Sequence, residues 1–175
     1  FVGRNREVDH LDQALHWAES GHGQVVALVG EPGVGKSRLV EECRHSSRTQ
    51  EWRVLESYAL SHGQATPYLP VIDLLTGYCG IDPRDAPRRR REKVVGTVLG
   101  LDEVLRSILT PTLALLDVPV EDADWPWLDP PQRRQRILEA VKRLLLRESQ
   151  VQPVLLFFED LHWIDAETQA LLDSL

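Results

Sequence analysis

The chain has 175 residues, of which 42% are hydrophobic and 27% charged, and its formal net charge at pH 7 is −7. This length and composition suit one globular domain with a substantial core and exclude a disordered chain. The acidic balance argues against a general nucleic-acid surface, and no apolar run reaches the roughly 18 residues that a membrane span needs.

The first predicted element is an amphipathic helix over residues 5–19. Apolar side chains recur there near helical spacing, and the glycines of residues 20–23 end the helix. Residues 24–29 are apolar and β-branched, which predicts a strand buried on both faces of a parallel sheet.

A phosphate-loop motif, G-x-x-x-x-G-K-S, follows this strand. It consists of Gly30, Glu31, Pro32, Gly33, Val34, Gly35, Lys36 and Ser37. The glycines let backbone N–H groups turn towards a β-phosphate, Lys36 reaches the β- and γ-phosphate oxygens, and the Ser37 hydroxyl ligates Mg²⁺. The predicted strand before the loop and helix after it favour a true phosphate loop over a chance match in a flexible glycine segment. We take residues 30–37 together with Arg38 as the nucleotide-binding segment.

The segments after the loop predict a βαβ unit followed by a long helical stretch. A helix is expected over residues 36–48 and a strand near residues 52–57. The next strand-like run begins only at Val154, so the interval must hold helices. Helical patterns occur at residues 68–78, 89–99, 102–116, with a break or kink at Pro111, and 130–149.

Residues 117–130 predict a loop between two of these helices, since they are rich in acids, proline and tryptophan. Trp125 and Trp127 are interpreted as hydrophobic anchors of this loop in preference to ligand-stacking groups. The clusters 88–91 and 133–136 are rich in arginine and are interpreted as solvated helix faces. Cys43 and Cys79 lack metal-ligand spacing, which predicts free or buried thiols in a reducing compartment, and without a signal segment the default location is the cytoplasm.

A pair of carboxylates follows the apolar run 154–158. Open α/β sheets bind ligands at the carboxyl ends of their strands, so Glu159 and Asp160 are placed to act on a nucleotide. We assign Glu159 to Mg²⁺ and Asp160 to polarising the attacking water, as in a Walker B motif. Without the phosphate loop, the same run would indicate only a strand end with solvated acids. His162 and Asp165 resemble a dyad but have no nucleophile nearby in the sequence, and Trp163 is interpreted as packing.

Four motifs together carry a family resemblance. They are Phe1-Val2-Gly3-Arg4, the loop 30–37 with Arg38-Leu39-Val40, Thr66-Pro67-Tyr68-Leu69-Pro70, and the run 156–165. In combination they resemble the AAA ATPase domain of bacterial multidomain signalling proteins, which are STAND-type NTPases. These include ATPase modules attached to class III adenylate or guanylate cyclases and to large ATP-dependent transcriptional regulators.

The resemblance implies a fold, a ligand and a role. The fold would be an α/β P-loop NTPase with a parallel sheet of the ASCE type and a mostly helical insertion over residues 60–150. The cofactors would be ATP and Mg²⁺, with Ser37 and Glu159 as metal ligands, Val2 and Gly3 at the adenine, and Arg4 anchoring that segment. The role would be a nucleotide-controlled switch, open or homo-oligomeric with ATP, that acts on cyclase, tetratricopeptide or DNA-binding domains of the same polypeptide.

The ends of the sequence predict an excised segment, because it begins without methionine and stops at Leu175 inside an apparent helix. Relative to the family, the sensor elements, an arginine finger and the strand between the two motif-bearing strands would lie beyond Leu175. We therefore expect poor stability of the isolated segment, since two apolar strands would lack their shared neighbour.

Three alternatives for the activity stay open. The exchanged order of the acids could leave a nucleotide-binding scaffold without hydrolysis, because Asp160 is one carbon shorter than the usual Glu. A small-molecule kinase would need an acceptor pocket and an arginine-bearing lid, for which residues 88–91 are the candidates. The loop reads phosphates and not the base, so it does not distinguish ATP from GTP, although the sequence has no Asn-Lys-x-Asp guanine signature.

Overall fold

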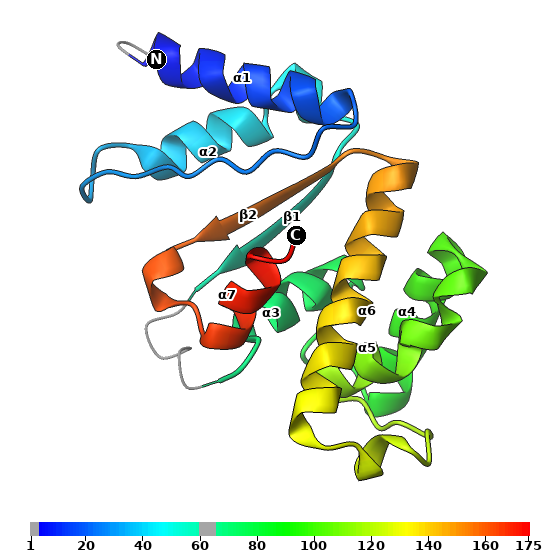
Figure 1. Cartoon of the computed structure of the whole chain (residues 1–175). Helices are drawn as coiled ribbons and strands as arrows, with labels where there is room; N and C mark the ends of the chain where they lie inside the picture. The colour runs from blue at the N-terminus through cyan, green and yellow to red at the C-terminus, as the bar shows by residue number, and fades with distance from the viewer. Residues whose placement is uncertain (1–3, 60–65) are drawn as a thin grey trace. The chain divides into compact units, whose positions relative to one another are not determined.

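The computed structural model describes residues 4–59 and 66–175. Its elements are α1 Asn5–Glu19, α2 Lys36–Arg44, η1 Ser47–Thr49, β1 Arg53–Tyr58, α3 Leu69–Tyr78, α4 Pro87–Leu101, η3 Glu103–Ile108, α5 Leu109–Leu115, η4 Trp125–Trp127, α6 Pro130–Val151, β2 Val154–Glu159, η5 Leu161–Trp163 and α7 Ala166–Leu172 (Figure 1). The η elements are short 3₁₀ helices. The chain divides into a first unit, residues 1–54 with 152–155, and a second unit, residues 55–151 with 156–175.

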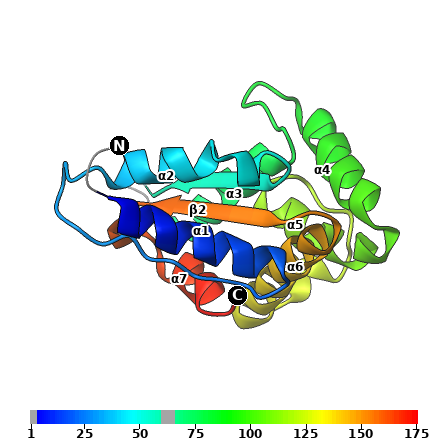
Figure 2. The same ribbon diagram turned by 90° about the horizontal axis from the view of Figure 1, so that it is seen from above.

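A small parallel sheet is formed by β1 and β2, which run side by side in the same direction (Figures 1 and 2). The Arg53 N–H donates to the Pro153 carbonyl at 2.8 Å, and the Ala59 N–H donates to the Glu159 carbonyl at 3.2 Å. Both bonds join residues offset by the same number of positions, so the register is constant along the pair. The prediction of these two strands is confirmed, although the side chains of β2 are half-buried rather than buried.

The strand predicted at residues 24–29 is wrong. In the described part of the chain this segment belongs to no strand, and Val25 and Val29 are 95% and 93% exposed. A strand needs a hydrogen-bonded neighbour, and the sheet of the described residues contains β1 and β2 alone. The β-branched residues of 24–29 favour a strand, but in the described part of the chain this segment has no neighbouring strand with which to pair.

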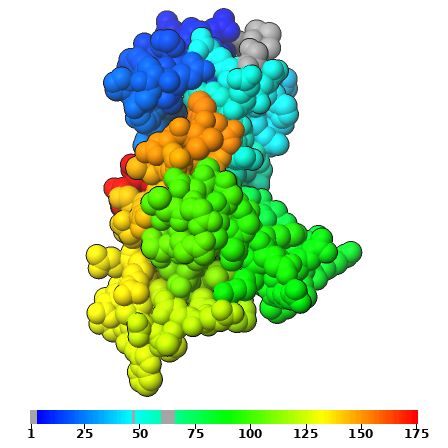
Figure 3. Space-filling view, turned by 90° about the vertical axis from the view of Figure 1, so that its right-hand side faces the viewer, coloured from blue at the N-terminus to red at the C-terminus, as the bar shows by residue number. Residues whose placement is uncertain are grey.

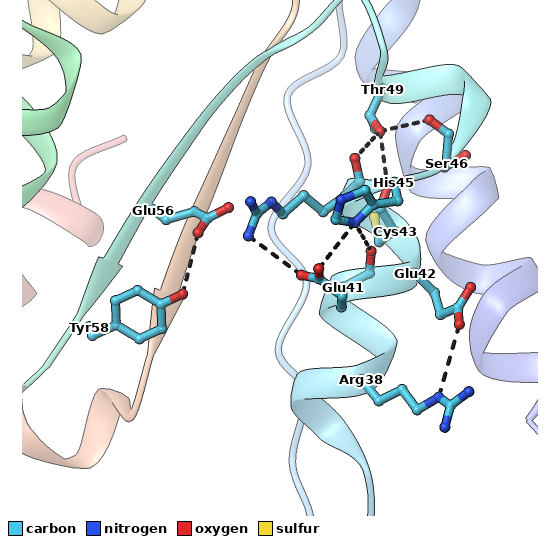
Figure 4. A network of polar contacts seen from close by, with 10 residues as sticks. Arg38, Glu41, Glu42, Cys43, His45, Ser46, Thr49, Glu56 and Tyr58 are labelled. Atoms are coloured by element: carbon cyan, nitrogen blue, oxygen red, sulfur yellow. Dashed lines mark hydrogen bonds and ion pairs between the residues drawn. The ribbon is translucent and has the colours of Figure 1, made fainter. Parts of the chain in front are cut away.

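In the first unit, α1 packs against α2. Leu15, Leu39, Cys43 and Trp52 are buried in this unit. The predicted helix 36–48 ends early, at Arg44. The Thr49 hydroxyl lies 2.9 Å from the carbonyl oxygen of Arg44 and 3.0 Å from that of Cys43 (Figure 4). It is therefore placed to donate a hydrogen bond to carbonyl groups that have no intrahelical partner at the end of a helix.

The second unit holds the helices that follow β1 in the chain. α5 packs against α6 and α4, and α3 packs against α7. In Figure 3 green atoms of α4 lie at the surface of this unit on the side turned to the viewer. The core of this unit includes Val71, Leu75, Val94, Val98, Leu116, Val141, Leu144 and Leu171. The helices predicted at residues 68–78, 89–99 and 130–149 are confirmed to within two residues at each end.

The predicted helix 102–116 is divided, but its break is not at Pro111. The 3₁₀ helix η3 passes into α5 at Leu109, and Pro111 lies in the first turn of α5. A proline is tolerated there because the N–H groups of a first helical turn have no intrahelical partner. None of the helices within the described part of the chain is both long and apolar enough to cross a membrane.

Several predictions about single side chains can be compared with the structure. Trp125 is buried and anchors its loop as predicted, whereas Trp127 is 87% exposed, so its predicted anchoring role is wrong. Arg88 pairs with Glu92 at 2.9 Å on the exposed surface of α4. Cys43 and Cys79 are free, buried thiols, and burial raises the pKa of Cys79 to about 11.

Candidate functional site

The segment 30–37 forms a tight loop at the start of α2, within the first unit. Gly33 and Gly35 have φ values of 81° and 88°, in the left-handed region that favours glycine. Gly35 is the N-cap of α2, and no side chain caps the helix there. The first turn of an α-helix directs its backbone N–H groups towards the residues that precede it, here the loop.

The ammonium group of Lys36 folds back over this loop. Its Nζ donates to the carbonyl oxygen of Gly30 at 2.8 Å and to that of Glu31 at 3.0 Å. A Cβ on Gly30 would lie 3.1 Å from Cγ2 of Val34, which is closer than nearly all real contacts. The motif glycine at position 30 thus leaves room for the close approach of the Val34 side chain.

Arg4 contacts the loop at Val34. Its guanidinium donates to the carbonyl oxygen of Val34, thirty positions along the chain. The resemblance assigned Arg4 an anchoring role, and this contact is one way in which it can anchor the N-terminal segment. Val2 and Gly3, predicted at the adenine, lie outside the described residues.

This loop fits a phosphate group. Left-handed glycines, a helix N-terminus without a side-chain cap and a lysine ammonium are the features by which such a loop presents donors and positive charge to an anion. Ser37 lies in the first turn of α2 and is exposed, as a metal-binding hydroxyl must be. Arg38 lies on the exposed side of α2, with its Nε 4.0 Å from Glu42 (Figure 4).

The two acids belong to the second unit. Glu159 is the last residue of β2, and Asp160 directly follows it with φ 56° and ψ 43°. The left-handed conformation is uncommon for residues other than glycine, and Asp is one of the few that tolerate it. Asp160 is exposed, and its carbonyl accepts from the Trp163 N–H at 2.9 Å, which fixes the turn η5 directly after the acids.

Asp165 has a role that the sequence reasoning missed. Its Oδ1 accepts from the N–H groups of Glu167 and Thr168, both at 3.0 Å, and of Tyr68 at 2.9 Å, while the Thr168 hydroxyl donates to Oδ2 at 2.7 Å. Burial alone would raise the pKa of this carboxyl, but these hydrogen bonds outweigh it and hold the pKa below its usual value. The D-x-x-T spacing of Asp165 and Thr168 is an N-cap signal, which could have predicted the capping of α7 but not the bond to Tyr68.

His162 and Asp165, which the sequence suggested as a dyad, each have another contact in the structure. The ring of His162 contacts that of Trp163, with centroids 4.9 Å apart and an interplanar angle of 48°. Trp163, interpreted as packing, is 37% exposed. Asp165 therefore acts here as a helix cap whose carboxylate oxygens are already engaged.

Comparisons with known proteins concern the chain as a whole. The chain is 24% identical over 174 residues to an uncharacterised protein of Rhizobium meliloti, an alignment that covers 98% of this chain and 16% of that relative. The chain thus spans about a sixth of the length of this curated relative. No solved structure matches. The model of the AAA ATPase domain family matches residues 1–175, and the chain therefore belongs to this family.

Proposed function

We propose that this chain is an ATP-binding, slowly hydrolysing regulatory domain that acts as a nucleotide-dependent switch in a multidomain bacterial signalling protein. The observation that carries the proposal is the loop 30–37, with its left-handed glycines and its uncapped helix, in a chain of the AAA ATPase domain family. Membership of this family implies nucleotide binding and the capacity for hydrolysis. The match to a small part of a much longer relative supports a role as one module among several.

The residues of the loop would hold the phosphates of ATP. On this proposal the N–H groups of residues 33–37 and the Lys36 ammonium bind phosphate oxygens, and Lys36 exchanges its bonds to Gly30 and Glu31 for bonds to the nucleotide. Ser37 in the first unit and Glu159 in the second are each proposed from their sequence motifs as ligands of Mg²⁺, which neutralises charge on the phosphates when bound. Arg4 would keep the loop closed through the Val34 carbonyl.

Asp160 is the proposed acceptor of the proton from the attacking water. Its exposed position at the end of β2 gives a carboxylate access to solvent. An aspartate reaches about one carbon–carbon bond less far than the glutamate usual at this position, which is the reason to expect slow turnover. A general base typically contributes about 10²- to 10⁴-fold to a rate.

Nucleotide binding is tested by titrating the full-length protein with a fluorescent ATP analogue. Lys36→Ala removes a charge-assisted donor and should weaken binding by at least about tenfold. Lys142→Ala is the matched control, because it removes an ammonium group from α6 in the second unit. Unchanged affinity in Lys36→Ala would refute the proposed binding site.

Hydrolysis is tested separately by steady-state phosphate release. Asp160→Asn should abolish most of the release while ATP still binds, and Asp124→Asn, an exposed acid in a loop, should leave it unchanged. The order of the acids also favours a second candidate, a scaffold that binds nucleotide without hydrolysing it. A wild-type protein that binds ATP yet releases no more phosphate than Asp160→Asn would establish the scaffold and refute the switch driven by hydrolysis.

A further inference from the structure

One hydrogen bond in the second unit joins the turn after the acids to the start of α3. The Tyr68 N–H donates to Oδ1 of Asp165 at 2.9 Å, across 97 positions of the chain. Tyr68 is buried and has φ 62°, in the left-handed region. A bulky residue keeps such a conformation only where its surroundings hold it, and the bond to Asp165 is one of the contacts that do so here.

The other end of this connection lies close to the acidic pair. Asp160 begins the turn η5, in which the Trp163 N–H donates to the Asp160 carbonyl at 2.9 Å and the Ile164 N–H to the Leu161 carbonyl at 3.3 Å. Asp165 follows this turn directly and caps α7. Asp160 and Asp165 are therefore joined by one short hydrogen-bonded turn.

A second chain of contacts extends the connection to α6. The Tyr68 hydroxyl donates to Oε2 of Glu167 at 3.3 Å, and Oε1 of Glu167 pairs with Arg134 at 2.6 Å. Glu167 lies in the first turn of α7 and Arg134 near the start of α6. The beginnings of α3, α6 and α7 thus meet at one polar cluster, formed by Tyr68, Arg134, Asp165, Glu167 and Thr168.

The Tyr68 contact is more than a helix cap requires. The N–H groups of Glu167 and Thr168 are the donors that capping of α7 must satisfy, and a serine or asparagine could accept from them as well. The bond to the Tyr68 amide adds nothing to that cap, and instead fixes the first residue before α3.

We propose that Asp165 couples the acid-bearing turn at Glu159 and Asp160 to α3 through the Tyr68 amide, so that a change of nucleotide state at the acids alters the start of α3. Asp165 is a positioning residue in this scheme, and it touches neither nucleotide nor metal. The inference rests on the proposed function, because it requires a nucleotide that acts on the acids.

The test is hydrogen exchange of the α3 amides in the full-length protein without nucleotide, with ADP and with a slowly hydrolysed ATP analogue. In the wild type, exchange in the first turns of Leu69–Tyr78 should differ between these states. Asp165→Ser keeps a capping oxygen for α7 but is too short to reach Tyr68. It should bind ATP within about twofold of the wild type and lose most of the nucleotide-dependent difference in α3.

Three variants separate the coupling from a merely structural effect. Asp165→Asn keeps an acceptor oxygen at Oδ1 and should retain the nucleotide response. Thr168→Val removes the hydroxyl contact to Oδ2 and should also retain it, as should Tyr68→Phe, which keeps the amide bond. If Asp165→Ser does not fold, the nucleotide-dependent exchange of α3 in the wild type and in Tyr68→Phe can still contradict the proposal.

Each outcome bears on the proposal. A normal response in folded Asp165→Ser would overturn it, as would loss of the response in Tyr68→Phe. A wild type that binds ATP without any change in α3 would overturn the coupling while the proposed nucleotide binding stands. A wild type that binds no nucleotide would refute the proposed function itself, and titration of the wild type with the fluorescent ATP analogue distinguishes that case.

Discussion

Replacing Gly35 by alanine tests whether the shape of the loop is what binds ATP. Gly35 has φ 88°, and a Cβ placed there would meet no atom within 4 Å. The substitution therefore causes no clash, and its cost is conformational alone. An L-residue in the left-handed region costs about 1–2 kcal/mol relative to glycine. If the free loop relaxes and ATP must restore this conformation, the affinity falls by a factor of about 5–30.

Gly21 provides a matched control for this experiment. It lies after α1 with φ 87° and likewise has nothing within 4 Å of a Cβ, so Gly21→Ala carries a similar conformational cost. It belongs to no predicted phosphate contact, and its ATP affinity should equal that of the wild type. Fluorescent-nucleotide titration measures the affinity, and urea unfolding measures the shared cost in stability. Equal ATP affinities for Gly35→Ala and wild type, or an equal loss in Gly21→Ala, would refute the reasoning.

Three further predictions concern the second unit. The buried Ser57 hydroxyl has no hydrogen-bond partner among the described residues, so Ser57→Ala should leave the free energy of unfolding unchanged or raise it by up to about 1 kcal/mol, measured by urea unfolding. The pKa of Tyr68 is raised to about 12, chiefly by burial and secondly by the charge of Glu167, whereas the pKa of an unfolded tyrosine is near 10. Stability should therefore fall as pH rises from about 10 to 12, and Tyr68→Phe should reduce this fall in urea midpoints taken across that range. Leu144→Ala should cost about 2–5 kcal/mol in thermal or urea unfolding because Leu144 is 1% exposed, whereas Leu146→Ala, at a 58% exposed site, should stay within about 0.5 kcal/mol.

The elements that the sequence predicts best are those whose pattern is local. The bounds of α1 are matched, and those of α6 to within two residues, because the apolar spacing and the flanking residues that define a helix lie within it. The segment 24–29 has an equally clear apolar pattern, yet its strand is not formed. A strand is stabilised by a neighbour that the segment itself does not contain, so its composition alone could not decide the outcome.

The same distinction explains what could be predicted of the candidate site. The residue types of the loop and of the acidic pair follow from short motifs, and the left-handed glycines lie where the motif places them. The bond between Asp165 and Tyr68 joins residues 97 positions apart, and no local signal pairs them. The exposure of Trp127 could not be predicted either, because nothing local distinguishes it from Trp125, which is buried in the same loop.

The loop keeps its shape although the segment before it joins no sheet. Its conformation is held by contacts from nearby residues: the left-handed glycines, the Lys36 bonds to Gly30 and Glu31, and the Arg4 bond to Val34. In a loop whose backbone is already ordered, ligand binding carries little additional cost in conformational entropy. The Lys36 bonds are the exception, because the ammonium must leave two carbonyls to reach a phosphate. The backbone of the loop is thus organised while the Lys36 ammonium is held by the loop itself, and on the proposed function any gain in affinity from Lys36 would be the difference between these two sets of bonds.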